Sequence, residues 1–230
     1  MDAAAIEAGY RGVRERIVAV ALEHRATLDT MVPACPEWSG RDLISHVAGV
    51  ADDLVAGNVH GYASAEWAAR HVVSLADASV DEVIERWRIA AARLRDAPPV
   101  MGTHALELAF GDAVVHEADL AAAIAPARRV PLPDVAVAIQ TGIARWRVVL
   151  RTAGAPSLRV EVPGLRTWWI GPAVDDPAAL EVDAYELFRL LYGRRSRVQV
   201  GGLAWSSDPT PYLDAGLSFP FTWSEQALGD

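Results

Sequence analysis

Four long segments with helical periodicity occupy most of the first 125 residues, and no other feature of this chain constrains its fold as strongly. Apolar residues recur every three or four positions in the first two segments, as with Leu43, Val47, Val50 and Leu54 in the second, so they share one face of a helix. Helices of this length bury such faces most readily against one another, which predicts a four-helix bundle. These helices are expected over residues 3–28, 40–56, 79–95 and 103–124.

Two of the predicted helices begin with capping signals. Ser39 is followed by Asp42, and Ser79 by Glu82. In each pair the serine oxygen can accept from the first free amides of the helix, while the acidic residue suits the first turn. Residues 57–78 lack a regular period and are expected to form an irregular connection.

The pattern changes in the second half of the chain. A Pro-Leu-Pro sequence suggests a linker, and Pro163 with Gly164 separates two short strand-like runs, which is typical of a hairpin turn. The chain is therefore predicted to be an α+β protein, with a four-helix bundle over 1–129 and a small α/β domain over 130–230. In the second domain, helices are expected over 135–150 and 183–192, and strands over 157–162, 165–170 and 197–200.

Composition excludes several function classes. The net charge is −9 and all 21 basic residues are arginine, so nucleic-acid binding is not expected, and a lysine Schiff base and a P-loop lysine are excluded. No apolar run reaches the roughly 20 residues of a membrane span. The acidic N-terminus lacks the layout of a signal peptide, so a cytoplasmic protein is expected. Cys35 is the only cysteine, which excludes an internal disulfide.

Three residues on two of the predicted helices form a candidate metal site. Asp112 and His116 are four residues apart, so both side chains project from one helix face. Asp119 follows three residues later on nearly the same face. His46 lies among apolar residues of another helix, where an unpaired imidazole would be costly to bury. Three protein ligands with open positions are usual at catalytic zinc and related metals.

Each of these features also has an ordinary explanation. An Asp/His pair at this spacing is frequently only a surface contact, and an inward histidine is frequently a hydrogen-bonded core residue. The remaining histidines indicate less. His24 suits a helix C-terminus, and His60, His71 and His104 are expected at the surface or beside a site.

Three runs of the sequence resemble the mycothiol-dependent maleylpyruvate isomerase family. The run VPACPEWSGRDLISHVAG over 32–49 resembles the family's Cys-Pro-x-Trp loop and the helix that follows it. The run DAVVHEADL over 112–120 is similar to a second signature, Glu-x-x-x-His-x-x-Asp, except that Asp112 replaces the glutamate. The run DAYELFRLLYGRR over 183–195 resembles the family's C-terminal domain.

The resemblance implies a DinB-like bundle in which His46, Asp112 and His116 hold a divalent metal, with zinc as the first choice. It also implies mycothiol, the small thiol of actinobacteria, as co-substrate, and a role for Asp119 near the thiol or substrate. A metal-bound thiol is deprotonated more readily than a free one. The implied activity is that of an isomerase or S-transferase acting on a small electrophile.

Other residues are candidates for binding the substrate or the thiol. Arg194 and Arg195 end the predicted C-terminal helix, where they would either bind a carboxylate or only favour the helix dipole. Trp38 is a candidate for the wall of the thiol pocket, although tryptophan is more often core. Cys35 is weighed as a nucleophile, but a small residue that packs its loop is the favoured interpretation.

Two other function classes stay open from the sequence. One is a metal-assisted enzyme of a natural-product or catabolic pathway that does not use mycothiol, which the exchange of glutamate for Asp112 favours. The other is a non-catalytic ligand- or metal-binding stress protein. The chain is expected to be a monomer or a homodimer, because helical bundles pair readily.

Overall fold

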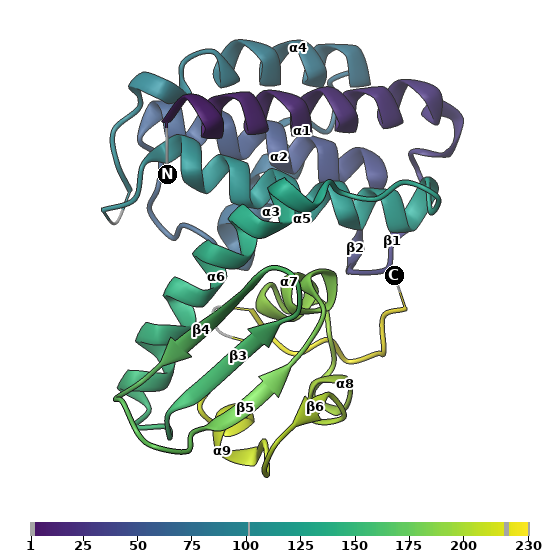
Figure 1. Ribbon diagram of the computed structural model, residues 1–230. Coiled ribbons are helices and arrows are strands. Elements are labelled where there is room, and N and C mark those ends of the chain that lie inside the picture. The colour runs from purple at the N-terminus through teal and green to yellow at the C-terminus, as the bar shows by residue number, and fades with distance from the viewer. Residues whose placement is uncertain (1–2, 101, 219–220, 230) are drawn as a thin grey trace. The chain divides into compact units, whose positions relative to one another are not determined.

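The computed structural model describes residues 3–100, 102–218 and 221–229. The chain forms two compact units, which meet in the sequence between Val130 and Pro131. Long helices and two small sheets confirm the predicted α+β class (Figure 1). Within the described ranges, no helix has the length and the apolar character needed to cross a membrane.

Four long helices build the first unit, as predicted: α1 (Ala3–Glu23), α2 (Gly40–Ala56), α4 (Val80–Ala91) and α5 (Ala105–Ile124). α1 packs on α5, and α2 packs on both α4 and α5 (Figure 1). α5 is buried along most of its length and so forms the centre of the unit. This arrangement places polar groups of α2 and α5 against each other inside an apolar bundle.

Capping boxes begin two of these helices where the sequence predicts them. The Ser39 side chain accepts from the backbone amide of Asp42, whose carboxylate accepts from the backbone amide of Ser39. Ser79 and Glu82 form the same reciprocal pair at the start of α4. Each serine cap contributes about 1 kcal/mol to stability. The start of α2, and with it the position of His46 along the helix, is thus set locally.

Residues 57–78, expected to be irregular, contain a further helix, α3 (Ala65–Ser74), so that expectation is wrong. Ser64 caps this helix by accepting from the backbone amide of Trp67 at 3.1 Å. α3 has only ten residues, and it is amphipathic where it packs on α2. Only Trp67 and His71 are buried among these ten residues, so the run is too short to show a sustained apolar period in the sequence.

Smaller elements complete the first unit. The helix expected over 3–28 ends at Glu23 and is followed by a 3-10 turn. The proline-containing segment before α2 forms a short antiparallel ladder rather than only a break. The elements are the 3-10 turns Arg25–Thr27 and Leu94–Asp96 and the strands β1 (Met31–Val32) and β2 (Cys35–Ser39).

Buried polar contacts tie α1 to its neighbours. Trp87 Nε1 donates to the hydroxyl of Tyr10 at 2.8 Å, and burial raises the pKa of Tyr10. Arg16 meets the buried carboxylate of Glu117 through two hydrogen bonds of 2.6 and 2.8 Å. Breaking such a buried pair is costly because it leaves an uncompensated charge. These contacts fix the register of α1 against α4 and α5.

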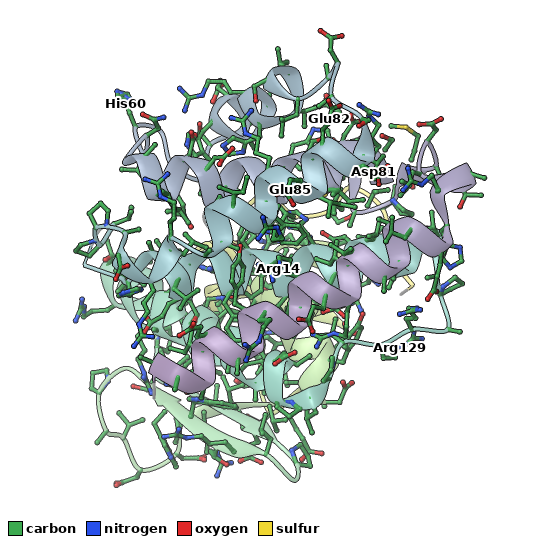
Figure 2. The ribbon with its side chains drawn as sticks, turned by 90° about the horizontal axis from the view of Figure 1, so that it is seen from above. Arg14, His60, Asp81, Glu82, Glu85 and Arg129 are labelled. Atoms are coloured by element: carbon green, nitrogen blue, oxygen red, sulfur yellow. The ribbon has the colours of Figure 1, made fainter. Side chains whose placement is uncertain are left out.

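Charged side chains cover the outside of α4. Asp81, Glu82 and Glu85 all lie on this helix (Figure 2). Asp81 pairs with Arg25 at 2.6 Å, and Glu85 with Arg88 at 2.7 Å. Exposed pairs of this kind contribute little to stability. We read them as a solvated face.

The second unit is a four-stranded sheet with helices. The sheet has the order β4-β3-β5-β6, in which β3 pairs antiparallel with β4 and parallel with β5 (Figure 1). α6 packs on α7 and on β4. The elements are α6 (Leu132–Thr152), β3 (Leu158–Val162), β4 (Arg166–Ile170), β5 (Ala178–Glu181), α7 (Ala184–Leu191), α8 (Arg197–Gly201), β6 (Ala204–Trp205) and α9 (Thr210–Asp214).

The hairpin predicted in this unit is confirmed, but one predicted strand is wrong. Gly164 sits in the β3–β4 turn with φ +77°, a conformation that side chains with a Cβ rarely adopt. Residues 197–200, expected as a strand, form the helix α8. Ser196 and Gln199 make a capping box there, which favours a helical turn over an extended segment.

Two other features of this unit differ from expectation. The predicted linker is the start of α6, since Pro133 lies in its first turn, where proline leaves no helical hydrogen bond unmade. The parallel strand β5 is absent from the predicted elements, and its neighbours in the sequence are loops. Its pairing with β3 is decided by the sheet and not by its own short pattern.

Candidate metal centre

The structure brings the three predicted metal ligands together where α2 packs on α5. His46 projects from α2, and Asp112 and His116 from α5. His46 Nε2 lies 3.6 Å from Asp112 Oδ1, and His116 Nε2 lies 3.6 Å from the same oxygen. One ligand atom from each residue falls within 4.8 Å of the other two. We call these three residues the metal cluster.

The geometry and chemistry of the metal cluster fit a divalent ion. Ligand atoms around a tetrahedral ion with bonds of about 2.0–2.2 Å are roughly 3.3–3.6 Å apart. The separations of both imidazoles from Asp112 match this, so the aspartate reaches far enough. The other oxygen of Asp112, Oδ2, is buried without a hydrogen-bond partner among the described residues. A cation beside this carboxylate would offset the unfavourable free energy of burying an oxygen that has no hydrogen-bond partner.

The second nitrogen of each histidine already has a partner. His116 Nδ1 lies 3.1 Å from Asp119 Oδ2, and the Asp119 side chain is fully buried. His46 Nδ1 lies 3.1 Å from Nδ1 of His71. With both Nδ1 atoms engaged, both Nε2 atoms are left facing Asp112. Histidines that bind metals are commonly oriented through their other nitrogen in this way.

In the metal-free protein, burial and neighbouring charges shift the pKa values of the metal cluster in opposite directions. Burial disfavours a charged His116, but the Asp112 carboxylate and the hydrogen bond to Asp119 together raise its pKa to about 10. Burial lowers the pKa of His46, and the attraction of Asp112 does not offset this. Burial would raise the pKa of Asp112, yet the neighbouring imidazoles keep it below its usual value. The metal-free cluster therefore pairs an ionised Asp112 with a protonated His116.

Two residues just before α2 border the metal cluster. The Trp38 ring lies 4.7 Å from the His46 ring and 6.3 Å from that of His116, between ring centroids. Cys35 Sγ lies 3.8 Å from Asp119 Oδ2. Both Trp38 and Cys35 are half-buried. The sequence singles out both residues, but only the fold shows that their loop returns to the cluster.

His71 and Asp53 extend this network. The sequence predicts His71 at the surface or beside a site, and the structure places it beside the metal cluster, whereas Asp53 was not among the predicted candidates. His71 is buried on α3, and its Nε2 lies 3.0 Å from Asp53 Oδ2 on α2. Asp53 follows His46 by seven residues, two helical turns, so a shared face was a detectable signal. His71 gave no such signal, because it lies in the helix that the sequence did not predict.

His60 and His104 have positions unrelated to the metal cluster. His60 is exposed and lies at the periphery of the first unit (Figure 2). His104 caps α5, where its Nδ1 accepts from the backbone amide of Leu106 at 3.2 Å. Neither contributes to the groups of potential metal ligands found among the described residues.

Arg194 and Arg195 make internal contacts within the second unit. Arg195 is buried and bonds both carboxylate oxygens of Glu186, at 2.6 and 2.9 Å. Arg194 donates to the backbone oxygen of Tyr192 at 2.7 Å and lies over the Phe221 ring. Their expected roles in binding a carboxylate remain predictions.

Comparison with known proteins relates the fold to one enzyme. The sequence matches no family model and no curated protein. Two solved structures match over 90% of this chain and 93% of their own. They are crystal structures of the mycothiol-dependent maleylpyruvate isomerase, with TM-score 0.60 and 17% identity, and of a histidine-to-alanine mutant of it, with TM-score 0.59 and 16% identity. At this identity, the chain shares their fold.

Proposed function

We propose that this protein is a metal-dependent enzyme that uses mycothiol as co-substrate and acts on a small electrophile as an isomerase or S-transferase. The observation that carries the proposal is the convergence of two buried imidazole nitrogens on the half-buried carboxylate of Asp112. The fold supports it, because the similar solved structures are described as a mycothiol-dependent isomerase.

His46, Asp112 and His116 would hold the ion and leave further coordination positions for water or a thiol sulfur. When bound, a divalent ion, with zinc as first choice, supplies positive charge that lowers the pKa of a neighbouring thiol from about 8.5. The protein's own task is to present three ligand atoms in the correct protonation state. Its neutral, buried His46 and the ionised Asp112 meet this requirement, while His116 must give up a proton.

The chemistry then follows from a thiolate beside an activated alkene. The sulfur forms a C–S bond to one alkene carbon while the π electrons move toward the conjugated carbonyl. After rotation about the resulting single bond, loss of the thiolate re-forms the double bond in the other geometry. The thiol is regenerated in an isomerisation, whereas S-transfer retains the C–S bond and expels a leaving group.

Two further residues of the first unit, Asp119 and Trp38, would orient the ligands and enclose the reactants. Asp119 accepts from His116 Nδ1, which leaves Nε2 of that ring free to bind the ion. Trp38 provides an apolar surface beside His46, suited to packing against a bound thiol or substrate. Arg194 and Arg195 are proposed to hold a substrate or thiol carboxylate, since guanidinium groups match carboxylates.

Metal analysis with matched variants tests the metal cluster. Wild-type protein is expected to carry about one divalent ion per chain, as three ligands around a single site imply. His116→Ala and Asp112→Asn should lose it, while the controls His60→Ala and Asp52→Asn should retain it. His60 is exposed, and Asp52 is paired with Arg86 on α4. Absence of stoichiometric metal in the wild type contradicts the proposal.

Turnover assays test the thiol. The metal-loaded protein is incubated with maleylpyruvate or with other small electrophiles, with and without mycothiol, and the products are identified by mass spectrometry. Turnover that requires mycothiol supports the proposal. Turnover without it favours a metal-assisted enzyme that dispenses with the thiol, and metal binding without turnover favours a binding protein.

A further inference from the structure

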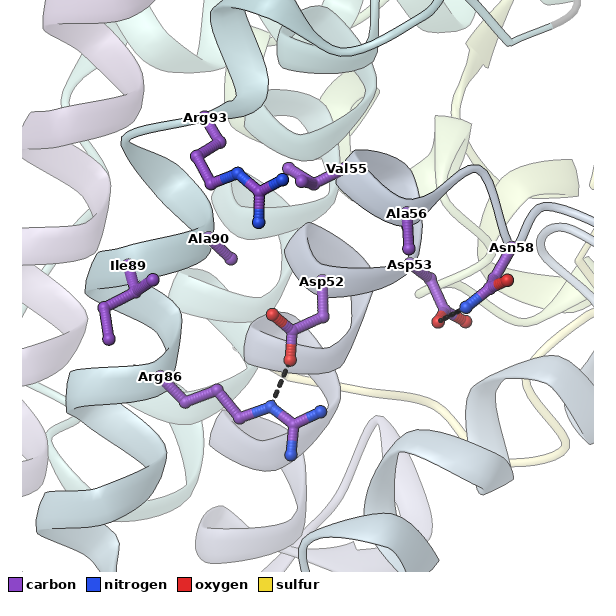
Figure 3. Close-up of a pocket in the computed structure, with 9 residues that line it drawn as sticks. All are labelled: Asp52, Asp53, Val55, Ala56, Asn58, Arg86, Ile89, Ala90 and Arg93. Carbon is purple, nitrogen blue, oxygen red and sulfur yellow. Dashed lines mark hydrogen bonds and ion pairs between the residues drawn. The ribbon is translucent and has the colours of Figure 1, made fainter.

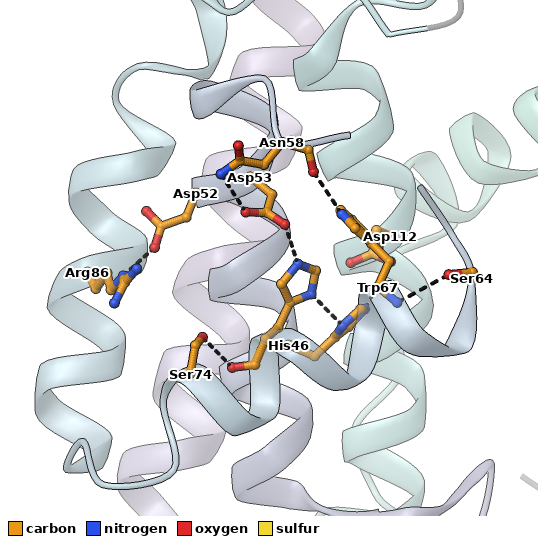
Figure 4. Close-up of polar contacts among 10 residues, drawn as sticks. His46, Asp52, Asp53, Asn58, Ser64, Trp67, Ser74, Arg86 and Asp112 are labelled. Atoms are coloured by element: carbon orange, nitrogen blue, oxygen red, sulfur yellow. Dashed lines mark hydrogen bonds and ion pairs between the residues drawn. The ribbon is translucent and has the colours of Figure 1, made fainter. Parts of the chain in front are cut away.

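His71 connects the metal cluster to a carboxylate outside it. Its ring is buried on α3, with Nδ1 3.1 Å from His46 Nδ1 and Nε2 3.0 Å from Asp53 Oδ2. Asp53 is 19% exposed at its side chain, so the chain of contacts runs from a partly solvated carboxylate to a buried ligand (Figure 4). No step of the proposed reaction uses His71 or Asp53.

Only one arrangement of protons lets His46 bind a metal and also satisfies both hydrogen bonds that link His46, His71 and Asp53. To offer a lone pair from Nε2, a neutral His46 must carry its proton on Nδ1. That proton is donated to His71 Nδ1, which therefore accepts. His71 then carries its proton on Nε2 and donates it to Asp53. The opposite arrangement leaves a proton on His46 Nε2, facing Asp112, where it blocks coordination.

Close packing holds His71 in this position. A Cβ added to Gly49 of α2 would lie 2.5 Å from Cβ and Cγ of His71, so α3 approaches α2 as closely as a glycine permits. The Trp67 ring lies 4.3 Å from the His71 ring, edge to face. Trp67 Nε1 in turn donates to the backbone oxygen of Asn58 at 3.0 Å (Figure 4). The imidazole is thus fixed by packing on two sides.

Asp53 lies next to a matched residue with different contacts. Asp52 and Asp53 both line a cleft of about 270 Å³ between α2 and α4 (Figure 3). Asp52 is paired with Arg86 of α4. Asp53 instead bonds His71, and Asn58 at 3.4 Å. One of the two neighbouring carboxylates therefore belongs to the histidine chain and the other does not.

We propose that Asp53 and His71 position His46 for metal binding, by fixing the proton of His46 on Nδ1 and thereby freeing Nε2. They form a carboxylate–imidazole–imidazole chain that parallels the direct contact of Asp119 with His116. Both are positioning residues that act through His46. The inference rests on the proposed metal centre and adds to it the residues that orient one ligand.

Metal affinity, measured by competition with a chelator, tests this role. Loss of a partner that orients a ligand lowers metal affinity about 10- to 100-fold, and this range is expected for Asp53→Ala and for His71→Leu. Asp52→Ala is the matched control and should bind metal like the wild type. His71→Gln keeps one acceptor and one donor, so it should recover part of the affinity lost in His71→Leu.

Nuclear magnetic resonance separates positioning from a general loss of structure. In the ¹⁵N-labelled, zinc-loaded protein, the Nδ1 proton of His46 should be seen, protected from exchange by its bond to His71. Asp53→Ala should weaken that protection while the Nδ1 proton of His116 stays unchanged. Because Asp53 lies at the surface of the bundle, this variant is expected to fold even where His71→Leu does not.

The outcomes distinguish this inference from the proposed function. A wild-type protein without metal overturns the metal centre itself. A wild-type protein that binds metal, together with an Asp53→Ala variant of equal affinity and an unchanged His46 Nδ1 proton, overturns only the positioning chain. Equal losses in Asp52→Ala and Asp53→Ala also overturn it, because both would then reflect the charge of the cleft.

Discussion

At the scale of single residues, Asp112 shows that helix packing, and not side-chain length alone, decides whether a carboxylate can reach a metal site. It is one methylene shorter than the glutamate of the family that the sequence resembles, yet its Oδ1 lies equally close to both imidazoles. The two histidines approach it from different helices, so the fold sets the separation. Its second oxygen is buried without a partner among the described residues, and a neighbouring cation would offset the cost of burying it.

Metal binding by this cluster should release a proton from His116. Without metal, the pKa of His116 is raised to about 10, so the ring is protonated at neutral pH. An ion can bind Nε2 only after that proton leaves. Apparent metal affinity should therefore rise about tenfold per pH unit from neutrality toward pH 10. Calorimetric titrations in two buffers of different ionisation enthalpy measure the released protons.

The raised pKa of His116 also predicts how the stability of the metal-free protein changes with pH. A raised pKa means that protonated His116 stabilises the folded state, fully below its ordinary pKa of 6.5, and that this contribution is lost as the pH rises through about 10. His116→Ala, compared with His60→Ala, isolates that contribution in unfolding measurements without metal. Zinc binding at pH 7 with no proton released contradicts the assignment of the proton to His116.

At the scale of helices, the contact of α3 with α2 links packing to the metal cluster. α3 is short, but it carries His71 and Trp67, the only buried residues among its ten. Gly49 on α2 makes room for it. Among the described residues, the first unit thus has four long helices that form the bundle and the short helix α3, whose buried face lies against α2, the helix that carries His46.

Two glycine-to-alanine substitutions should have opposite effects. Gly12 lies in α1, and a Cβ there meets only Nη1 of Arg16, at 3.2 Å, while Nε and Nη2 make the bonds to Glu117, so a small shift of Nη1 accommodates the Cβ. Gly12→Ala should therefore stabilise the protein by about 0.5–1 kcal/mol, through helix propensity. Gly49→Ala should destabilise it by about 1–3 kcal/mol, because its Cβ collides with His71. Urea unfolding of the metal-free variants measures both.

Metal affinity gives this pair a second readout. Gly49→Ala displaces His71 and should weaken metal binding, while Gly12→Ala should leave it unchanged. A Gly49→Ala protein as stable as Gly12→Ala, with unaltered metal affinity, would show that α3 adapts without cost. The close approach of α3 would then have no bearing on the metal cluster.

At the scale of the whole molecule, the two units differ in what they contribute. Every residue of the metal cluster and its outer partners lies before Val130, whereas the second unit has its own sheet and its own buried core around Trp146. Arg195 and Glu186 form an internal ion pair in that second unit. The proposed metal binding therefore belongs to the first unit.

Added metal should stabilise the first unit selectively. A ligand at 100 times its dissociation constant adds about 2.7 kcal/mol to the free energy of unfolding. Hydrogen exchange with mass spectrometry should show slower exchange along α2 and α5 when zinc is added, with little change along α7. Equal slowing in both units, or none in either, contradicts a metal site confined to the first unit, and Asp112→Asn should show no effect of zinc.

The sequence by itself determined the helices whose signals are local. The capping serines and the long apolar periods predicted α2 and α5 closely, and with them the faces that carry His46, Asp112 and His116. These signals are readable because each depends on residues within a few turns. Short elements were missed or misassigned although they carry capping signals. Ser64 caps α3, and Ser196 with Gln199 forms a capping box at residues 197–200, but each helix is too short to show a sustained apolar period.

Only the tertiary structure decided what surrounds the ligands. The packing of α2, α3 and α5 turns Nε2 of both histidines toward Asp112 and brings His71 to His46. It also places Cys35 and Trp38 beside the cluster. Contacts between segments distant in the sequence follow from how whole faces fit together, and one sequence carries no direct record of them. The spacing and the family resemblance named the three candidate ligands and Asp119 beside His116, but the contacts of His71 and Asp53 with His46 followed only from the fold.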